Sequence, residues 1–426
     1  MARSCYTLKT MSNKEHLPGP EPDQYFDSEY WKQLHEQFEI PAFPFETLID
    51  VDYYLQNLPL KEISLAARGS KVALEGGSLP ERLNKYLNML IFLTGGPPGP
   101  IGLQFVAQPE KERGLIKIDS LGDHPGYADS LIEEEHEVTP GLIHKFFDRV
   151  LFIVTGQCAA YCRYCTRGRL VGAEGARTID EVDQAFAYIK AHPEIKEIIF
   201  SGGDSFILPR QMFEYVIEQA RQFQDSGQID SIRFGTRSFI HNPDTIKDWH
   251  YEGLQKIYAP NVMVHYNHPH EITVQVKSVL DSLRQAGASL HSQSVLLKGV
   301  NNDRQVLNAM FRKGQKHGIA PYYVFNCDEV PWGKGFVVPV QEAEVLAFQN
   351  RAELPGLAGR ARFVIDVPQG HAKVPFNEGF WVDKNTLMDY HGQLFGITED
   401  GLVVKLSEAE AAVKRATLNI KSPHHV

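Results

Sequence analysis

Three cysteines stand close together in the stretch GQCAAYCRYCTR, which covers residues 156–167. Cys158, Cys162 and Cys165 have the spacing CxxxCxxC, and the other two cysteines of the chain are far away in sequence. Structural zinc sites usually take four ligands as two close pairs. A [4Fe-4S] cluster has four irons, so three thiolates on one loop leave the fourth iron open for a small bidentate ligand. The spacing favours this cluster, and a zinc site or three buried thiols are the alternatives.

The cysteines follow the first of several short β-branched runs that alternate with amphipathic segments. This alternation is typical of repeated βα units around a parallel sheet. The segment 179–189 has a helical apolar period, and Thr178 and Glu181 give it a capping-box pattern. A second predicted helix, 276–286, stops at Gly287. The predicted strands are residues 150–154, 195–200, 229–234, 262–266, 290–297 and 322–325, with a seventh extended run at 363–365.

Polar and glycine-rich stretches follow these predicted strands. Ligands of α/β folds bind at the carboxyl ends of the parallel strands, so these loops should converge with the cysteines on one site. The stretches are SGGD at 201–204, GTR at 235–237, NHPHE at 267–271, KGVNND at 298–303 and NCDE at 326–329.

The chain divides into three predicted parts. Residues 1–140 form an N-terminal, mainly helical extension, in which the stretch TGGPPGPIG at 94–102 cannot continue a helix or a central strand. Residues 141–340 form the region of βα units, and residues 341–426 form a C-terminal segment. This segment contains LFGITEDGLVVKL, which predicts a hairpin around an Asp-Gly turn, and the helix-like SEAEAAVKRA.

Composition narrows the class of protein. The net charge of -10 and the pI near 5.9, without a long basic run, argue against a nucleic-acid partner. No long apolar window and no apolar signal core occur, which argues against a membrane partner and for a cytoplasmic protein. Five cysteines are few and odd in number, which favours a reducing compartment over a disulfide framework.

The cysteine triplet after the first strand of a βα repeat resembles the radical S-adenosylmethionine superfamily. Within that superfamily the chain resembles the lysine 2,3-aminomutase family, because a set of motifs between about residue 140 and residue 376 follows the order typical of that family. The resemblance implies an α/β fold, a partial (β/α)6 TIM-like barrel. The motifs read PGLIHKFFDRVLFIVTGQCAAYCRYCTR, FSGGD, IRFGTR, VHYNHPHEIT, SQSVLLKGVNND, PYYVFNCDE and FVIDVPQGHAKVPF.

The resemblance implies three cofactors. The [4Fe-4S] cluster on the three cysteines would bind S-adenosylmethionine through its open iron. Lys373, in the C-terminal segment, would carry pyridoxal 5′-phosphate (PLP), and Arg149 would grip its phosphate with a bidentate guanidinium. Lys145 stands where the family more often has a second arginine and is a further candidate for the phosphate. Without the resemblance, Lys373 reads as a solvated loop charge and Arg149 as a surface salt bridge.

The same resemblance implies residues that recognise an amino acid substrate. Arg167 matches the arginine that binds the substrate carboxylate. Asp328 and Asp366 match two acidic residues that hold the terminal ammonium of lysine. A glutamate-using relative would need a cation or an amide at one of these places. Taken alone, each aspartate could equally be a loop or N-cap residue.

Further residues match family positions around S-adenosylmethionine. Their alternative role is that of inward-pointing polar residues of the barrel, hydrogen-bonded to the backbone. The SGGD loop would contact the methionine amino group, and two residues on later strands would lie beside the same cofactor. They are Ser201, Gly202, Gly203 and Asp204 in the loop, and His265 and Gln293 on the strands.

The implied activity is that of an isomerase that moves the α-amino group of L-lysine to C3 and gives β-lysine. A 5′-deoxyadenosyl radical would remove hydrogen from C3, and a flavodoxin- or ferredoxin-type protein would donate the electron. The alternatives are the same chemistry on another amino acid or on a carrier-bound lysine, and a non-catalytic iron–sulfur protein on the same fold. Assembly as a homo-oligomer stays open.

The chain departs from the family pattern at three places. Tyr164 stands between the second and third cysteines, where the family usually has histidine, and QGHAK, with His371, replaces a glycine run before the lysine. The C-terminal cysteines that bind zinc in some members are absent, so we expect no structural zinc.

Overall fold

Ten strands form one sheet whose spatial order follows the order along the chain, from β1 to β10. Strands β3 to β9 run parallel, and β1, β2 and β10 pair antiparallel at the two edges. The strands are β1 Glu137–Thr139, β2 Leu142–Phe146, β3 Arg149–Thr155, β4 Glu197–Gly202, β5 Ser231–Thr236, β6 Asn261–Val264, β7 Ser289–Leu296, β8 Ile319–Asn326, β9 Arg362–Asp366 and β10 Lys373–Pro375.

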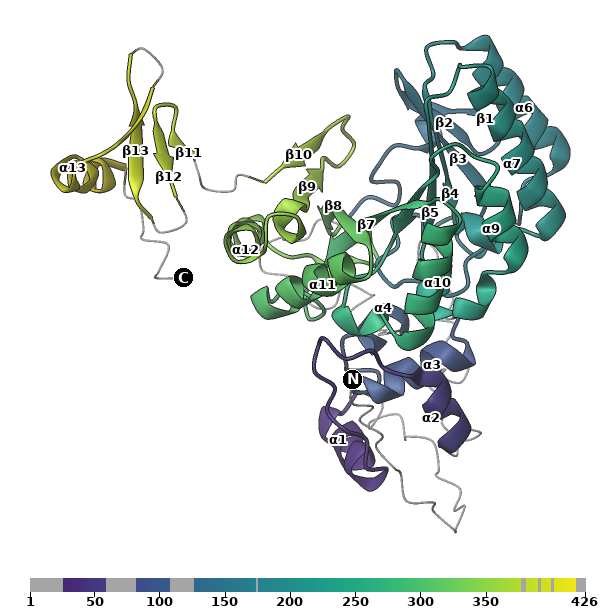
Figure 1. Cartoon of the computed structure of the whole chain (residues 1–426), viewed down its shortest axis with the longest axis horizontal. Helices are drawn as coiled ribbons and strands as arrows, with labels where there is room; N and C mark the ends of the chain where they lie inside the picture. The colour runs from purple at the N-terminus through teal and green to yellow at the C-terminus, as the bar shows by residue number, and fades with distance from the viewer. Residues whose placement is uncertain are drawn as a thin grey trace.

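The sheet curves without closing, so that it forms an open, partial barrel (Figure 1). Among the residues that the structure describes, the edge strands β1 and β10 do not pair with each other. This arrangement confirms the predicted α/β fold with a partial barrel of parallel strands. The computed structural model describes residues 26–58, 82–107, 126–173, 175–376, 381–389, 392–399 and 402–418.

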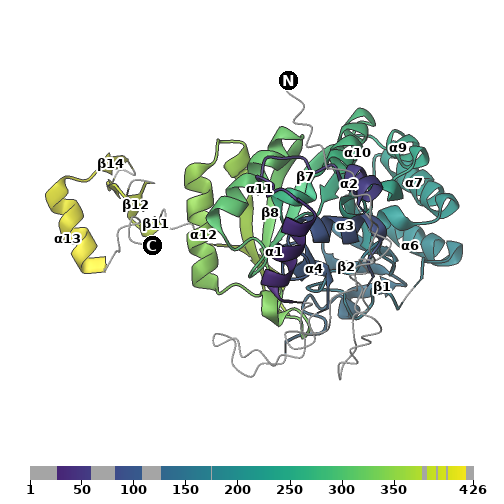
Figure 2. The ribbon, with the colours of Figure 1, turned by 90° about the horizontal axis from the view of Figure 1, so that it is seen from below.

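Helices connect the parallel strands and lie around the outside of the curved sheet (Figure 1, Figure 2). The first of them begins with the predicted capping box, in which Thr178 and Glu181 bond each other's backbone. Its buried residues Val182, Phe186 and Ile189 pack into the core that the strands share. The connecting helices are α6 Ile179–Ala191, α7 Arg210–Asp225, α8 Ser238–His241, α9 Asp248–Leu254, α10 Val274–Gln285, α11 Arg304–Lys316 and α12 Val340–Glu353, with 3-10 turns η1 Glu134–His136, η2 Ser205–Ile207, η3 Pro243–Thr245, η4 Pro269–Glu271, η5 Lys334–Phe336 and η6 Ala358–Arg360.

The N-terminal helices have an apolar core of their own, centred on Trp31, Leu90 and Phe92. Ala160 of the cysteine loop is buried in the same core, so these helices pack directly on that loop. Figure 2 shows them across one end of the barrel. The third helix ends at the start of the predicted Pro/Gly stretch. These helices are α1 Ser28–Gln37, α2 Val51–Asn57, α3 Lys85–Leu93 and α4 Gly102–Phe105.

A second, four-stranded sheet follows in the C-terminal segment (Figure 1). All its neighbouring strands pair antiparallel, and Lys414 Nζ of the last helix binds the Asp383 carboxylate at 2.8 Å. The predicted hairpin corresponds to its last two strands, and the predicted helix follows them. The elements are β11 Trp381–Asp383, β12 Thr386–Met388, β13 Leu394–Ile397, β14 Val403–Lys405 and α13 Glu408–Leu418.

All seven predicted extended runs of the barrel are strands, with ends that differ by a few residues. The largest difference is in β8, which begins at Ile319, three residues before the predicted start. Pro321 reads as a strand breaker because it has no N–H. Here it pairs with β7 only, because the pairing of β8 with β9 begins at Tyr323. On the β9 side, where Pro321 has no partner, the missing N–H therefore removes no hydrogen bond of the sheet.

The ten-stranded sheet extends beyond residue 340, where the sequence analysis placed the start of the C-terminal segment. Strands β9 and β10 belong to the C-terminal segment of the predicted division, yet they extend the ten-stranded sheet. Within the described ranges, no helix has the length and apolar character that crossing a bilayer would require.

Candidate active site

The cysteine loop leaves the carboxyl end of β3 and is fixed at its start by the loop after β4. Gly203 donates its backbone N–H to the Thr155 carbonyl at 2.6 Å, and the Asp204 N–H reaches the Gln157 carbonyl at 2.8 Å. A Cβ at position 203 would lie 2.1 Å from the Gln157 carbonyl oxygen. Glycine is therefore required where the two loops meet. The structure brings the SGGD loop and the cysteine loop together.

The three thiols of the cysteine loop are free and partly buried. Burial raises the pKa of the Cys165 thiol to about 12, and burial beside the Asp204 carboxylate raises the pKa of Cys158 well above its usual range. Arg237 donates from NH1 to the sulfur of Cys162 at 3.0 Å. Thiolates in such surroundings need further positive charge, which bound iron would supply.

The donor set on this loop is three thiols, the ligand type of iron–sulfur clusters. In the part of the chain that the structure describes, no three His, Cys, Asp or Glu side chains converge closely enough to hold one metal ion. In a [4Fe-4S] cluster, each thiolate binds its own iron, so the sulfurs stay apart. The donor set of three thiols beside one guanidinium therefore fits the predicted cluster.

Lys373 and Asp366 face each other across the antiparallel pair β9 and β10. Nζ of Lys373 lies 2.6 and 2.7 Å from the two carboxylate oxygens of Asp366 and 4.8 Å from the centre of the Phe325 ring. Asp328 follows the end of the neighbouring strand β8. Burial, together with the nearby Asp366 carboxylate and against the opposing charge of Lys373, raises the pKa of Asp328 to about 7. Three predicted residues thus lie together.

Lys145 and Arg149 flank the turn between β2 and β3. Nζ of Lys145 and Cζ of Arg149 lie 5.9 and 5.5 Å from the centre of the Phe146 ring. Lys145 donates to the Gly370 carbonyl at 2.6 Å, and burial lowers its pKa although Asp366 opposes the change. Arg149 pairs with its neighbour Asp148 at 2.9 Å, and its side chain is 43% exposed. Both cations contact the Phe146 ring, but Arg149 makes the surface pair that was the alternative to phosphate binding.

Arg167 forms a buried, bidentate ion pair with Glu133, a residue that the sequence analysis missed. Nε and NH2 of Arg167 donate to the two oxygens of Glu133 at 2.9 and 2.7 Å. NH1 donates to Ser201 Oγ at 3.2 Å. The exposed fractions of the Arg167 and Glu133 side chains are 16% and 6%. One edge of the guanidinium is thus occupied by the protein, and the NH1–NH2 edge is the one that a substrate carboxylate could share.

Asp204, a predicted contact of S-adenosylmethionine, is bonded to other parts of the chain. Both oxygens of the Asp204 carboxylate accept hydrogen bonds from within the chain, among them the backbone N–H groups of Phe206, Arg237 and Ser238 at 3.0, 2.6 and 2.8 Å. Asp204 therefore holds the loops after β4 and β5 in place. Gly202 has a φ of 127°, which the turn into this loop requires.

His265 and Gln293 lie at the carboxyl end of β6 and on β7. His265 Nε2 lies 3.2 Å from the hydroxyl of Tyr164, the residue that departs from the family pattern. The same hydroxyl accepts a hydrogen bond from Asn267 at 2.5 Å. Gln293 pairs in register with Tyr323 of β8. Tyr164 is thus a buried polar contact of the loops around the cluster rather than a solvent-facing substitution.

Two further residues of this site were not singled out from the sequence. Glu133 lies in the acidic run EEE just before β1, and Arg237 ends the GTR stretch after β5. A lone acidic run usually reads as a solvated surface, and GTR reads as a turn. The signal that could have identified Arg237 is its position at the carboxyl end of a parallel strand, the same signal that marked SGGD.

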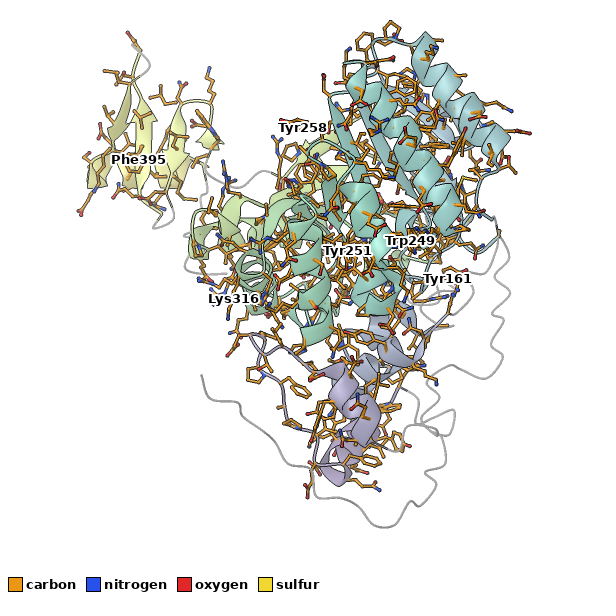
Figure 3. All side chains as sticks on the ribbon, turned by 45° about the vertical axis from the view of Figure 1, so that its right-hand side comes forward. Tyr161, Trp249, Tyr251, Tyr258, Lys316 and Phe395 are labelled. Atoms are coloured by element: carbon orange, nitrogen blue, oxygen red, sulfur yellow. The ribbon has the colours of Figure 1, made fainter. Side chains whose placement is uncertain are left out.

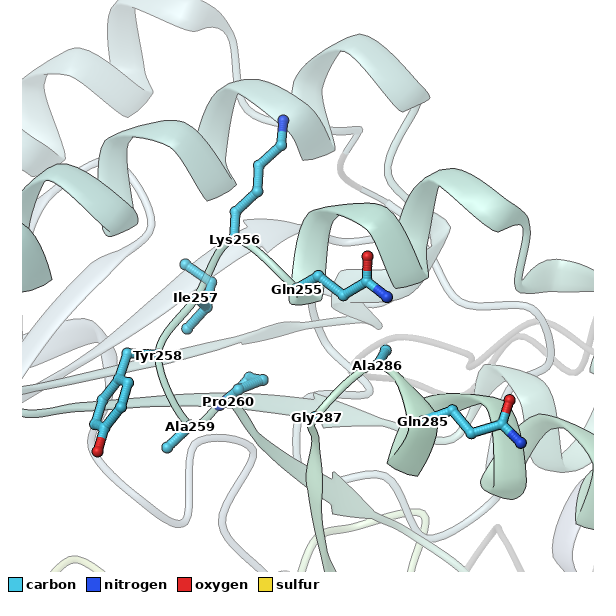
Figure 4. Close-up of a pocket in the computed structure, with 9 residues that line it drawn as sticks. All are labelled: Gln255, Lys256, Ile257, Tyr258, Ala259, Pro260, Gln285, Ala286 and Gly287. Atoms are coloured by element: carbon cyan, nitrogen blue, oxygen red, sulfur yellow. The ribbon is translucent and has the colours of Figure 1, made fainter.

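A surface pocket lies elsewhere on the barrel (Figure 4). Its lining includes Tyr258 and Pro260, which precede β6, and Gly287, which precedes β7. These loops are at the amino ends of the strands, whereas the cysteines are at the carboxyl ends. Figure 3 shows Tyr258 well apart from Tyr161 of the cysteine loop. None of the predicted site residues lines this pocket.

Comparison of the sequence with known proteins identifies the family of this chain. Residues 152–310 match the model of the Radical SAM superfamily. A putative L-lysine 2,3-aminomutase of Aquifex aeolicus is 32% identical over 78% of this chain and 84% of its own length. The L-lysine 2,3-aminomutase of Bacillus subtilis is 32% identical over 88% and 79%. A glutamate 2,3-aminomutase of Clostridioides difficile is 30% identical over 72% and 71%. With three thiols on the loop after the first parallel strand, the chain belongs to the radical S-adenosylmethionine superfamily and, within it, to the lysine aminomutase family of isomerases.

Proposed function

We propose that this enzyme moves the α-amino group of L-lysine to C3 and produces β-lysine. The observation that carries the substrate assignment is the ion pair of Lys373 with Asp366. A primary alkylammonium, that of Lys373, lies 2.6 and 2.7 Å from the carboxylate oxygens, beside the buried Asp328. The side chain of lysine ends in the same chemical group. These carboxylates therefore suit the substrate's terminal ammonium once the nitrogen of Lys373 is committed to PLP.

Charge complementarity also separates lysine from glutamate. The related C. difficile protein is named a glutamate 2,3-aminomutase. Two carboxylates close together would repel the side-chain carboxylate of glutamate and attract an ammonium. Asp328 and Asp366 thus favour a basic substrate. At the other end of the substrate, Arg167 would bind the α-carboxylate through the guanidinium edge that Glu133 leaves free.

The residues present fit the cofactors that the family implies. Cys158, Cys162 and Cys165 would hold the [4Fe-4S] cluster, Lys373 would hold PLP, and Lys145 with Arg149 would face its phosphate. When bound, the cluster with S-adenosylmethionine supplies the radical that removes hydrogen from C3, and PLP carries the migrating nitrogen. The chain itself binds the two charged ends of the substrate, fixes C3 in position and excludes water. We further propose a cytoplasmic enzyme that takes its electron from a flavodoxin- or ferredoxin-type donor.

The test is the product formed from free L-lysine. The anaerobically reconstituted full-length protein, with PLP, S-adenosylmethionine and a reductant, should convert L-lysine to β-lysine, detected by mass spectrometry. Parallel reactions contain L-glutamate or L-arginine, and Lys373→Ala is the inactive control, which should also lose the visible absorbance of bound PLP. No β-lysine from a protein with intact cluster and bound PLP would overturn the lysine assignment.

The same reactions decide between the remaining candidates. Product from L-arginine alone would identify another basic amino acid as substrate. Formation of 5′-deoxyadenosine without any product from free amino acids would favour a carrier-bound lysine. The absence of 5′-deoxyadenosine from a reduced, cluster-containing protein would leave a non-catalytic iron–sulfur protein.

A further inference from the structure

Arg237 is a fully enclosed cation that contacts the cysteine loop. Its side chain is 6% exposed and extends from the carboxyl end of β5. NH1 donates to the Cys162 sulfur at 3.0 Å and also contacts the hydroxyl of Tyr164. The guanidinium carbon lies 4.7 Å from the centre of the Phe105 ring of α4. The charge is therefore shielded from water and directed at one of the three sulfurs.

The other nitrogen of this guanidinium is held in place by two acceptors. NH2 donates to Gln104 Oε1 at 2.6 Å and to Glu271 Oε1 at 2.5 Å. The second oxygen of Glu271 accepts the backbone N–H groups of Asn267 and His268 at 2.5 and 3.1 Å. Glu271, whose side chain is 1% exposed, thus stays on the side of Arg237 away from Cys162. The pair is neutral as a whole, but its positive end faces the sulfur.

We propose that Arg237 is a positioning residue of the iron–sulfur cluster that makes the cluster easier to reduce. The proposal rests on the cluster assigned above to the three cysteines. One-electron reduction takes the cluster from the 2+ to the 1+ state, with the electron supplied by the external donor. Hydrogen bonds to the cluster sulfurs and nearby positive charge stabilise the added negative charge and so raise the reduction potential. Arg237 supplies both at the Cys162 sulfur.

A purely structural role would also explain the burial of Arg237, because its side chain joins α4, the cysteine loop and η4. The two roles differ in the sign of an electrostatic effect. Removing the charge of Arg237 should make the potential more negative, whereas removing the opposing charge of Glu271 should make it less negative. Damage to the packing has no reason to move the two variants in opposite directions.

The experiment is an anaerobic redox titration of the reconstituted full-length protein, followed by electron paramagnetic resonance of the reduced cluster. We expect Arg237→Gln to shift the midpoint potential downward, Glu271→Gln to shift it upward, and Arg237→Lys to fall between Arg237→Gln and the unsubstituted protein. The control is Arg233→Gln, because Arg233 lies on β5, the strand that leads to Arg237, but pairs with Glu197 at 2.6 Å, away from the cysteines. Iron content and visible absorbance verify the cluster in each sample.

The possible outcomes separate this inference from the proposed function. Unshifted potentials, or shifts of the same sign in Arg237→Gln and Glu271→Gln, would overturn the role of Arg237 alone. If Arg237→Gln fails to hold the cluster, the upward shift in Glu271→Gln decides the question. An unsubstituted protein that takes up no [4Fe-4S] cluster would overturn the cluster assignment together with this inference.

Discussion

Among single residues, Asp328 and Asp366 are both proposed to bind the substrate ammonium, but they have different surroundings. Asp366 already has a cation, the Nζ of Lys373, on both of its oxygens. The pKa of the Asp328 carboxyl is raised to about 7 by desolvation and by Asp366. A substrate ammonium should therefore favour the ionised form of Asp328.

We expect Asp328→Asn to weaken the binding of L-lysine by about 2–5 kcal/mol, because one partner of a buried charge pair is lost. The measurement is isothermal titration of L-lysine into the PLP-containing protein. The matched control is Glu329→Gln, which removes the carboxylate of the next residue along the chain. Equal affinity in Asp328→Asn and the unsubstituted protein would show that this carboxylate does not contact the substrate.

The affinity for L-lysine should depend on pH through the same residue. The raised pKa of about 7 means that Asp328 is largely protonated below pH 7, and lysine binding then requires the release of that proton. Affinity should therefore rise with pH through about 7 and level off above it, with a slope of up to about tenfold for each pH unit below the pKa. In the protein without substrate, Asp366 and Glu133 raise this pKa and Lys373 lowers it. In Asp328→Asn this step should be missing.

Glu133 is expected to matter for stability as well as for the orientation of Arg167. Replacing it by glutamine leaves a buried guanidinium without its counter-charge, and we expect Glu133→Gln to lower the free energy of unfolding by about 3 kcal/mol. Glu134→Gln is the control, because the side chain of Glu134 is 63% exposed and its pair with Arg169 should contribute no more than about 1 kcal/mol. Denaturant unfolding of both variants in the same cofactor state measures the difference. Equal losses would mean that burial of the Arg167 pair has no special effect.

At the scale of elements, the site depends on where loops meet and not on the strands alone. The register of β9 and β10 places Lys373 opposite Asp366, and a slip of one residue would turn Lys373 to the other face of the sheet. At the other side of the site, the loop after β4 is bonded to the first residues of the cysteine loop. These two contacts set the distance between the predicted PLP lysine and the cluster.

We expect Gly203→Ala to reduce the iron content of the reconstituted protein. The added Cβ would meet the Gln157 carbonyl oxygen at 2.1 Å, so the cysteine loop must move away. Gly235→Ala on β5 is the control, because there the nearest atom, Ser201 Oγ, would lie at 3.4 Å, an ordinary contact. Iron analysis after anaerobic reconstitution compares the two. Full iron content in Gly203→Ala would show that the cysteine loop tolerates the displacement.

In the whole molecule, the cysteine loop contacts both the N-terminal helices and the loop after β8. Arg82, which precedes α3, donates to the Cys158 carbonyl at 2.8 Å, and Trp332 after β8 donates to the Cys165 carbonyl at 2.7 Å. Ala160 is buried among the N-terminal helices. The loop therefore joins the N-terminal helices to the barrel near β3 and near β8.

Because the loop joins these parts, loss of the cluster should lower the stability of the whole fold. A ligand that binds only the folded state stabilises it, so chelation of the iron should lower the thermal midpoint, by about 1 °C for each kcal/mol lost in a chain of 426 residues. Cys162→Ser should show the same low midpoint without a chelator. Cys327→Ser is the control, since Cys327 is buried outside the loop and should leave the response to the chelator intact. Scanning calorimetry compares the unsubstituted protein and Cys327→Ser, each with and without chelator, and Cys162→Ser without it.

The order of strands and helices and the three thiols of one loop could be predicted from the sequence. Short β-branched runs bounded by turn residues identify strands, and a capping box such as that of Thr178 and Glu181 is local. The convergence of SGGD, GTR and NCDE on one end of the barrel follows from strand direction. The resemblance to a family then supplied Lys373, Arg167 and the two aspartates, which no local pattern distinguishes from surface charges.

The pairing of the buried charges could not be predicted from the sequence. Glu133 and Arg167 are 34 residues apart, as are Arg237 and Glu271, and sequence spacing gives no sign that either pair meets. Strand register decided that Lys373 faces Asp366. The physical reason is that hydrophobic pattern and turn chemistry act between near neighbours, whereas buried ion pairs form between side chains that the folded backbone brings together and shields from water.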